Sequence, residues 1–298
     1  MVFSFPREIR ANCNGAKCLS DMSEWFRRAE RVCDDVVVDV SQVRWFDANL
    51  CAALGVLLAR KNASGLRVHV IGDMHPALKS VLSNNGFWGV EIDGQPFDLN
   101  LNMNKFYGKS YLPYRRFEVD EHRAFTKQYA RMFIQQKCIP NMTECVQKML
   151  TDSLGELFDN ARTHSETMYG VFVCGQNFPK KHQVHLTVAD GGIGFRSRIL
   201  KSRKEDWGPA GAIDWAMAKT NTTRTEDISG GVGLKMLRFF IELNRGFISV
   251  VSDRGYWELG PKGVFFTELE RSFPGTVVSV IVNTADDNSY ATKAELAA

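Results

Sequence analysis

Short runs of β-branched residues alternate with segments of helical periodicity along the first third of the chain, and this alternation constrains the fold more than any other feature. Two runs, 36–40 and 66–71, have the composition of buried strands. Strands that alternate with helices predict an α/β domain, which we place at residues 1–97. Its expected elements are a helix at 19–32, a strand at 36–40, a helix at 47–60 capped by Asp47, a strand at 66–71 and a short helix at 76–85.

The rest of the chain mixes longer helices with more widely spaced strands. Residues 98–120 lose clear periodicity and gain Asn, Gly and Pro, which indicates a linker. Beyond it we expect a second α/β domain of helices on a mixed sheet at 121–285, and a tail at 286–298. Its expected helices lie at 121–137, 142–164 and 232–244, and its expected strands at 169–174, 183–190, 247–252, 264–268 and 276–283. A polar, glycine-containing stretch fills the interval up to about residue 230.

The composition excludes several classes of protein. Hydrophobic residues make up 44% of the chain and charged residues 24%, which is typical of folded globular proteins. A net charge of +3 is too small to support nucleic-acid binding. The longest apolar run, 50–59, is too short to span a membrane, and the N-terminus lacks a signal peptide, so we expect a cytoplasmic protein with no membrane partner. The 7 cysteines include no Cys-x-x-Cys pair, which favours reduced thiols over a zinc site.

A polar ridge accompanies the apolar stripe of the helix expected at 142–164. Asn141 and Glu144 have the spacing of a capping box at its start. Glu156, Asn160 and His164 follow at intervals of four and therefore share one side of the helix. Such a ridge on its own fits a solvated face as well as a functional one.

A glycine turn follows the strand expected at 183–190. Asp190 ends that strand, and Gly192 and Gly194 come directly after it. Because glycine has no Cβ, backbone at these positions can approach a planar ring closely. The same residues also fit a simple tight turn.

A second glycine turn precedes the helix expected at 232–244. Gly231 and Gly233 stand at its start, where unpaired N–H groups of a helix can receive phosphate. By itself this turn is only moderately specific. The three features together occur in a characteristic order along the chain.

In that order, the stretches resemble the motifs of the GHKL (gyrase, heat-shock chaperone, histidine kinase, MutL) ATPase superfamily. Residues 156–165 resemble its N-box, 190–194 its adenine-binding box and 231–234 its second glycine box. Phe-Pro-Gly-Thr-Val at 273–277, before a β run, resembles the Gly-Thr that precedes the family's last strand. The resemblance covers 121–285 and implies a Bergerat fold, an α/β sandwich that holds ATP between the N-box helix and the glycine boxes.

The resemblance also implies a role for each matching residue. Asp190 would accept the adenine amino group, Asn160 would coordinate the Mg²⁺ that bridges the phosphates, and Thr276 would support Asp190 and the ring through water. Glu156 would be the general base that orients an attacking water or hydroxyl. The implied ATP-binding residues, with the phosphates on Gly231 and Gly233, are Asn160, His164, Asp190, Gly192, Gly194, Gly231, Gly233, Leu234 and Thr276.

Parts of the likeness stay open. His164 is expected either to meet the phosphates or to pack against its neighbours. Residues 195–229 take the position of the ATP lid, which varies most within the family. The lid residues that either contact the γ-phosphate or belong to a solvated loop are Lys219, Thr222, Thr223 and Arg224. His122-Arg123 lacks the acidic neighbour of a phospho-accepting histidine, so ordinary two-component signalling is not expected.

The N-terminal domain contains three stretches, 35–41, 46–50 and 66–72, that resemble a STAS domain, the fold of anti-sigma-factor antagonists, and the likeness covers about 70 residues. In that family a phosphorylated Ser or Thr follows an Asp at a helix start, where the helix N-terminus stabilises the phosphate. Here Ala48 and Asn49 follow Asp47, and neither has a hydroxyl. We therefore do not expect this domain to be a phospho-switch.

Together the resemblances predict a Mg-ATP-binding signalling protein with a protein partner that is STAS-like or transcription-regulatory. Three mechanisms are compatible with the sequence. The first is a lid-based switch that hydrolyses ATP, the second a module that sequesters its partner with little turnover, and the third a serine/threonine kinase acting on a separate antagonist. The sequence leaves the oligomeric state open.

Overall fold

The computed structural model describes residues 1–87, 111–218 and 232–296, and its first region is the α/β unit that the alternation predicts. Three parallel strands lie in the order β1-β3-β5. A small parallel pair, β2 with β4, lies beside them. The elements are β1 (Val2–Ser4), β2 (Glu8–Ile9), α1 (Cys13–Ala29), β3 (Asp35–Asp39), β4 (Trp45–Phe46), α2 (Cys51–Ala63), β5 (Arg67–Ile71) and α3 (Pro76–Asn84).

Two helix starts differ from the prediction. Helix α1 begins at Cys13, six residues before the expected start, because Asn12 caps it by accepting a hydrogen bond from the Gly15 backbone N–H. Asp47 is not a side-chain cap for the short 3₁₀ turn η1 (Ala48–Leu50) that leads into α2. Its carboxylate instead accepts hydrogen bonds from the Ala11 backbone N–H and the Trp45 indole, at 2.8 and 2.7 Å. Asp47 therefore ties the start of α1 to β4.

The second region is built on a five-stranded sheet in the order β6-β7-β8-β10-β9. The strands are β6 (Tyr111–Phe117), β7 (Val171–Phe178), β8 (Gln183–Asp190), β9 (Phe247–Gly260) and β10 (Gly263–Asn283). Every pairing in this sheet is antiparallel, so the mixed sheet expected from the sequence is wrong in strand direction although the α/β class is confirmed.

The strands of this sheet agree with the sequence prediction at some boundaries and differ from it at others. β8 has the bounds expected from its apolar run, whereas β6 lies in the segment expected to be a linker. The strands expected at 264–268 and 276–283 are one long strand, β10, whose register against β9 shifts on either side of Phe273. The Pro-Gly pair at 274–275 accounts for the break in the pattern, since proline cannot donate to the ladder.

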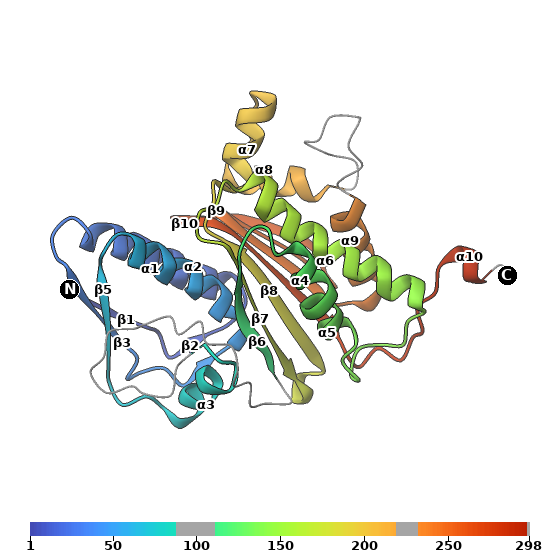
Figure 1. Cartoon of the computed structure of the whole chain (residues 1–298), viewed down its shortest axis with the longest axis horizontal. Helices are drawn as coiled ribbons and strands as arrows, with labels where there is room; N and C mark the ends of the chain where they lie inside the picture. The colour runs from blue at the N-terminus through green and yellow to red at the C-terminus, as the bar shows by residue number, and fades with distance from the viewer. Residues whose placement is uncertain (88–110, 219–231, 297–298) are drawn as a thin grey trace.

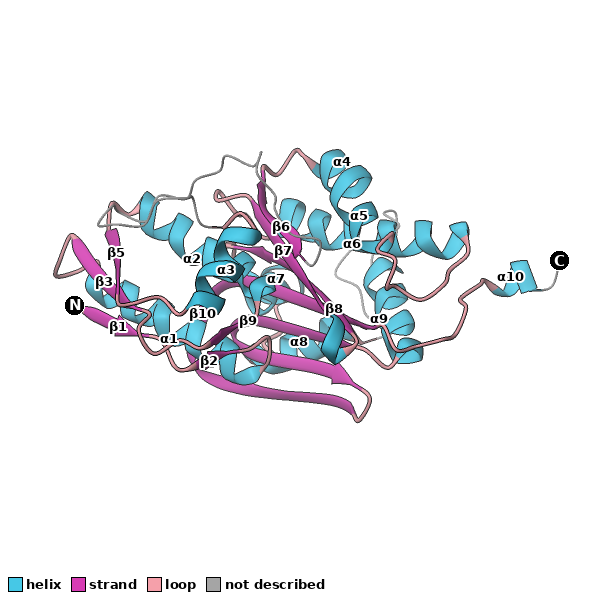
Figure 2. Ribbon diagram, turned by 90° about the horizontal axis from the view of Figure 1, so that it is seen from below, coloured by secondary structure: helices cyan, strands magenta, loops and turns pink. Residues whose placement is uncertain are grey.

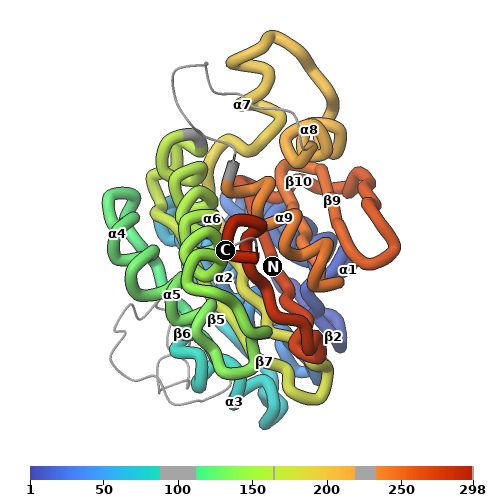
Figure 3. Tube along the Cα trace, turned by 90° about the vertical axis from the view of Figure 1, so that its right-hand side faces the viewer, coloured from blue at the N-terminus to red at the C-terminus, as the bar shows by residue number. Residues whose placement is uncertain are grey.

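Helices cover one face of this sheet. They are α4 (His122–Ala124), the π-helix η2 (Phe125–Ala130), α5 (Arg131–Ile134), α6 (Glu144–His164) and α9 (Val232–Asn244). Figure 3 shows α6 beside α9. The C-terminal segment reaches α9 through Tyr290, whose ring packs against Phe240, and α10 (Lys293–Leu296) meets the start of α6 where the Thr143 hydroxyl donates to Glu295. The N-cap of α6 is Thr143, whose hydroxyl accepts from the Val146 N–H, and not Asn141 as the capping-box spacing predicted.

Two further helices, α7 (Gly194–Arg203) and α8 (Pro209–Met217), occupy much of the stretch expected to take the position of the ATP lid. Helix α7 projects from the body of the molecule (Figure 1). The two helices are 10 and 9 residues long and are separated by a break before Pro209, so neither is long enough to produce a clear helical period in the sequence.

The opposite face of the five-stranded sheet is covered by α1 and α2, which lie between the two sheets (Figures 1 and 2). One hydrophobic core contains residues of both regions, including Leu54 and Leu57 of α2 with Phe172 of β7 and Val277 of β10. The layers therefore run from the parallel sheet through α1 and α2 to the antiparallel sheet and then to α6 and α9. Among the described residues, no helix has the length and apolar character that a bilayer span requires.

Candidate functional site

A pocket lies where α6, β8, α7, α9 and β10 meet, at one end of the antiparallel sheet. Its apolar wall is formed by Leu157, Ala161, Val188, Leu234 and Val278. Its polar side chains are Asn160, Ser165, Asp190, Arg198 and Thr276. Five residues predicted from separate stretches of sequence, Asn160, Asp190, Gly194, Leu234 and Thr276, are thus brought together in one cavity.

Asp190 is the buried acid of the pocket and the last residue of β8. Burial raises the pKa of its carboxyl to about 7, although hydrogen bonds from the Gly192 backbone N–H and from Ser165 act in the opposite direction. The Gly192 N–H lies 2.9 Å from Asp190 Oδ1. Thr276 is the direct cross-strand partner of Asp190 on β10, so both side chains lie on the same face of the sheet.

The turn after Asp190 requires glycine at positions 192 and 194. A Cβ at Gly192 would lie 2.0 Å from the Ser165 carbonyl oxygen, which is far inside van der Waals contact. Gly194 has a φ of +75°, a conformation that side-chain-bearing residues rarely adopt. The Ile193 N–H also donates to the Ser165 carbonyl at 2.7 Å. The turn is therefore fixed against the end of α6.

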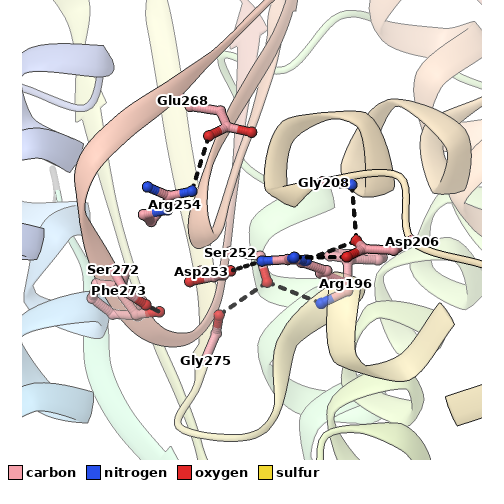
Figure 4. Close-up of polar contacts among 11 residues, drawn as sticks. Arg196, Asp206, Gly208, Ser252, Asp253, Arg254, Glu268, Ser272, Phe273 and Gly275 are labelled. Atoms are coloured by element: carbon pink, nitrogen blue, oxygen red, sulfur yellow. Dashed lines mark hydrogen bonds and ion pairs between the residues drawn. The ribbon is translucent and has the colours of Figure 1, made fainter. Parts of the chain in front are cut away.

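Ser252 of β9 holds the start of α7 against the sheet (Figure 4). Its hydroxyl accepts from the Phe195 N–H at 3.0 Å and donates to the Gly275 carbonyl at 3.1 Å. The next residue of α7, Arg196, forms two hydrogen bonds with Asp206, at 2.8 and 2.7 Å, and an ion pair with Asp253 at 3.7 Å. These contacts fix the helix that carries Arg198 to the wall of the pocket.

Glu156 lies beside the pocket rather than in its lining. Its Oε2 accepts a hydrogen bond of 2.6 Å from the backbone N–H of Gly233, the second residue of α9. A Cβ at Gly233 would lie 2.9 Å from the Ser153 Cα on α6, so the close approach of α9 to α6 depends on the glycine. The predicted base and one predicted phosphate-binding glycine are therefore neighbours.

Other predicted residues have a less complete description. Gly231 and the lid candidates Lys219, Thr222, Thr223 and Arg224 lie outside the described residues. His164 ends α6, and its side chain lies outside the described part of the chain. Sequence reasoning gave no role to Ser165, Ser252 or Arg198. Of these three residues, only Ser165 could have been found from the sequence, because it lies within the motif at 156–165.

Asn160, which the sequence predicts as a magnesium ligand, lines the pocket. It is half-buried and lies one helical turn after Glu156 on α6. Residues 1–87, 111–218 and 232–296 contain no group of three or more His, Cys, Asp or Glu that could hold a metal on their own. A carboxamide oxygen suits Mg²⁺, which takes few protein ligands and completes its shell with phosphate and water.

The start of α2, where a STAS antagonist would carry its phosphate, is buried on the back of the antiparallel sheet. The Ala48 N–H donates to Gln176 Oε1 at 2.9 Å, and Asn49 Nδ2 donates to Thr187 Oγ1 at 2.8 Å. Thr187 is in turn 2.7 Å from the hydroxyl of Ser279. Ala48 and Asn49 are fully buried, which makes this helix start a contact within the chain.

No model of a known protein family matches the chain, and no curated protein is significantly similar to it. The structure shows an α/β protein in which the side chains of Asp190, Asn160 and Thr276 line one pocket. The likeness to the GHKL and STAS families rests on the motifs alone.

Proposed function

We propose that the chain binds a purine nucleotide, ATP with Mg²⁺, in this pocket in the manner of histidine kinase-like ATPases. The observation that carries the proposal is the convergence of Asn160, Asp190 and Thr276 from α6, β8 and β10. Residues this far apart in sequence meet here beside a glycine turn that admits no side chain at Gly192. Each of them also matches a residue of the family's motifs.

The pocket chemistry suits a flat heterocycle with an exocyclic amine. Asp190 offers carboxylate oxygen in apolar surroundings, where a hydrogen bond from an amine is stronger than in water. Leu157, Leu234 and Val278 offer apolar contacts for the faces of a ring. A small number of polar groups in an apolar cavity is typical of a specific small-molecule site.

The chain's residues are compatible with a nucleotide that brings its own Mg²⁺. Asn160 would hold the ion, and the phosphates and water would complete its coordination. When bound, the ion neutralises phosphate charge and prepares the γ-phosphoryl group for transfer. Glu156, one turn earlier on α6, would orient the water or hydroxyl that attacks.

A binding module with little turnover is the second candidate, and one contact favours it. The Glu156 carboxylate accepts the Gly233 N–H at 2.6 Å, so this oxygen is already engaged. If Glu156 must break this hydrogen bond before it can orient the attacking water, the rate of ATP turnover is low. In either case we propose that a protein partner, STAS-like or transcription-regulatory, reads the nucleotide state.

Calorimetry with Mg-ATP and incubation with radiolabelled ATP test these alternatives. We expect Asn160→Ala and Asp190→Ala to abolish ATP binding, and Glu156→Ala to bind ATP without turnover. Free phosphate identifies an ATPase, label on a partner protein identifies a kinase, and binding without either identifies the module. Unimpaired phosphate release by the Glu156 variant would contradict its role as base, and absence of any heat with Mg-ATP would refute the proposed function.

A further inference from the structure

The contact between Glu156 and Gly233 lies at one end of the pocket. Asn160 follows Glu156 by one turn of α6 and lines the cavity, and Leu234 follows Gly233 and lines it from α9. The opposite end of the cavity is marked by Ser165 and Asp190. Nine residues of helix separate Glu156 from Ser165, a rise of roughly 14 Å. The contact and the buried acid thus bracket the pocket along α6.

Glu156 places negative charge where the first turn of α9 would otherwise attract an anion. The N–H groups in the first turn of a helix have no acceptor within the helix, and they carry the positive end of its dipole. The Gly233 N–H is one of these groups, and Glu156 Oε2 accepts it at 2.6 Å. An anionic ligand that reaches this end of the pocket must therefore either displace the carboxylate or lie beside it.

The energetic consequence depends on the charge that the ligand brings. Two negative charges about 4 Å apart repel by about 1 kcal/mol in bulk water and by more in a partly buried site. A divalent cation bound to the phosphates offsets this repulsion, because carboxylate and carboxamide oxygens are attractive to it. The contact therefore disfavours a bare polyphosphate much more than one that is already complexed with a metal ion.

We propose that Glu156 determines ligand specificity by excluding metal-free nucleotides from the pocket and admitting the metal complex. The inference rests on the proposed function, since it concerns the phosphate end of the same site. It gives Glu156 a role in binding that is separate from proton transfer. It also names the ligand as the magnesium complex of a nucleoside polyphosphate.

The test compares ATP binding in excess EDTA with ATP binding in excess Mg²⁺, measured by calorimetry on the full chain. Glu156→Gln keeps the size and an acceptor oxygen for Gly233 but removes the charge. We expect it to bind metal-free ATP about tenfold more tightly than the wild type, as expected from the loss of one close repulsive contact. The ratio of the two dissociation constants should shrink by the same factor.

Asp152→Asn is the matched control. Asp152 lies one turn before Glu156 on α6, and its exposed carboxylate pairs with Lys148 at 2.7 Å. This change removes the same charge from the same helix and leaves the contact between Glu156 and Gly233 in place. We expect both dissociation constants to stay within about twofold of the wild-type values, because exposed charges are screened.

Adenosine, which has no phosphate, tests whether each variant keeps an intact pocket. We expect equal adenosine affinity for the wild type, Glu156→Gln and Asp152→Asn, and Glu156→Ala should repeat the result of Glu156→Gln. A wild-type ratio that persists in both Glu156 variants would overturn the specificity role while leaving nucleotide binding in place. Failure of the wild type to bind adenosine or ATP in any condition would overturn the proposed function and this inference together.

Discussion

The two faces of the antiparallel sheet bury polar groups in different ways, and β8 contributes to both. Val188 and Asp190 point to the side of α6 and the pocket, whereas His185 and Thr187 point to the side of α2. On the pocket side the buried acid borders an open cavity. On the other side Asn49, Thr187 and Ser279 form a buried chain of hydrogen bonds. The same strand thus borders a pocket on one face and an internal contact on the other.

Burial neutralises the titratable group on each face, with opposite consequences for pH. It raises the pKa of Asp190 to about 7 and lowers the pKa of His185 to about 4. For His185, nearby Asp47 acts against burial and Lys181 acts with it. A buried acid that is readily neutral can still accept or donate a hydrogen bond to a ligand. A buried imidazole without access to a cavity only makes the fold sensitive to acid.

The largest effect is expected from Asp190→Asn on the pH dependence of stability. The pKa of this carboxyl rises from 3.8 to about 7 on folding, so its contribution is fully present below about pH 3.8 and is lost as the pH rises through 7. This loss is on the order of 4 kcal/mol. Denaturant unfolding between pH 4 and 8 should show the variant gaining stability over the wild type as the pH rises. A difference that is constant with pH would contradict the buried, shifted carboxyl.

A smaller effect of opposite sign is expected from His185→Phe. The pKa of this imidazole falls from 6.5 to about 4 on folding, so its contribution is present above pH 6.5 and is lost as the pH falls toward 4. The loss is on the order of 3 kcal/mol. The same unfolding series should show that the variant loses less stability in acid than the wild type does. Equal acid sensitivity would mean that His185 is not sealed behind the sheet.

A substitution on the pocket face of the sheet should lower the affinity for Mg-ATP. Asp190→Ala removes the acceptor that the proposed amine contact requires, and we expect at least about a hundredfold loss in Mg-ATP affinity, the size of a lost hydrogen bond to a charged group. Isothermal calorimetry at pH 8, where the carboxyl is ionised, measures it. An affinity within tenfold of the wild type would place the ring elsewhere.

The smallest effect is expected on the opposite face. Asn49→Ala removes the hydrogen bond to Thr187 and should lower the free energy of unfolding by about 1–2 kcal/mol, because Thr187 is left buried with fewer partners. Mg-ATP affinity should stay within about twofold of the wild type. A large loss of affinity with unchanged stability would show that the two faces of the sheet are coupled.

The sequence predicted those parts of the fold whose pattern is local. The bounds of β8 and α9 follow from an apolar run and a helical period, and Asp190 and Asn160 meet as their motifs implied. Strand direction was not predictable, because β-branched runs look alike in parallel and antiparallel sheets. β6 was not predicted because Pro113 and the neighbouring polar residues are typical of a linker.

Some features of the site depend on contacts between distant segments and have no local signal. Ser252 acts through the Phe195 N–H and the Gly275 carbonyl, which lie 57 and 23 residues away in the sequence. The contact between Glu156 and Gly233 likewise spans 77 residues. Motifs therefore indicate which residues gather at the pocket, whereas the hydrogen bonds that orient them emerge only from the tertiary structure.

Helices α1 and α2 lie between the parallel sheet and the antiparallel sheet, and they bury apolar side chains against both. Splitting the chain after α3 would leave Phe172, Ala189 and Val277 without a covering layer. We expect each fragment to aggregate when produced alone, and to recover when both are produced together. We therefore expect each half of the chain to need the other in order to fold.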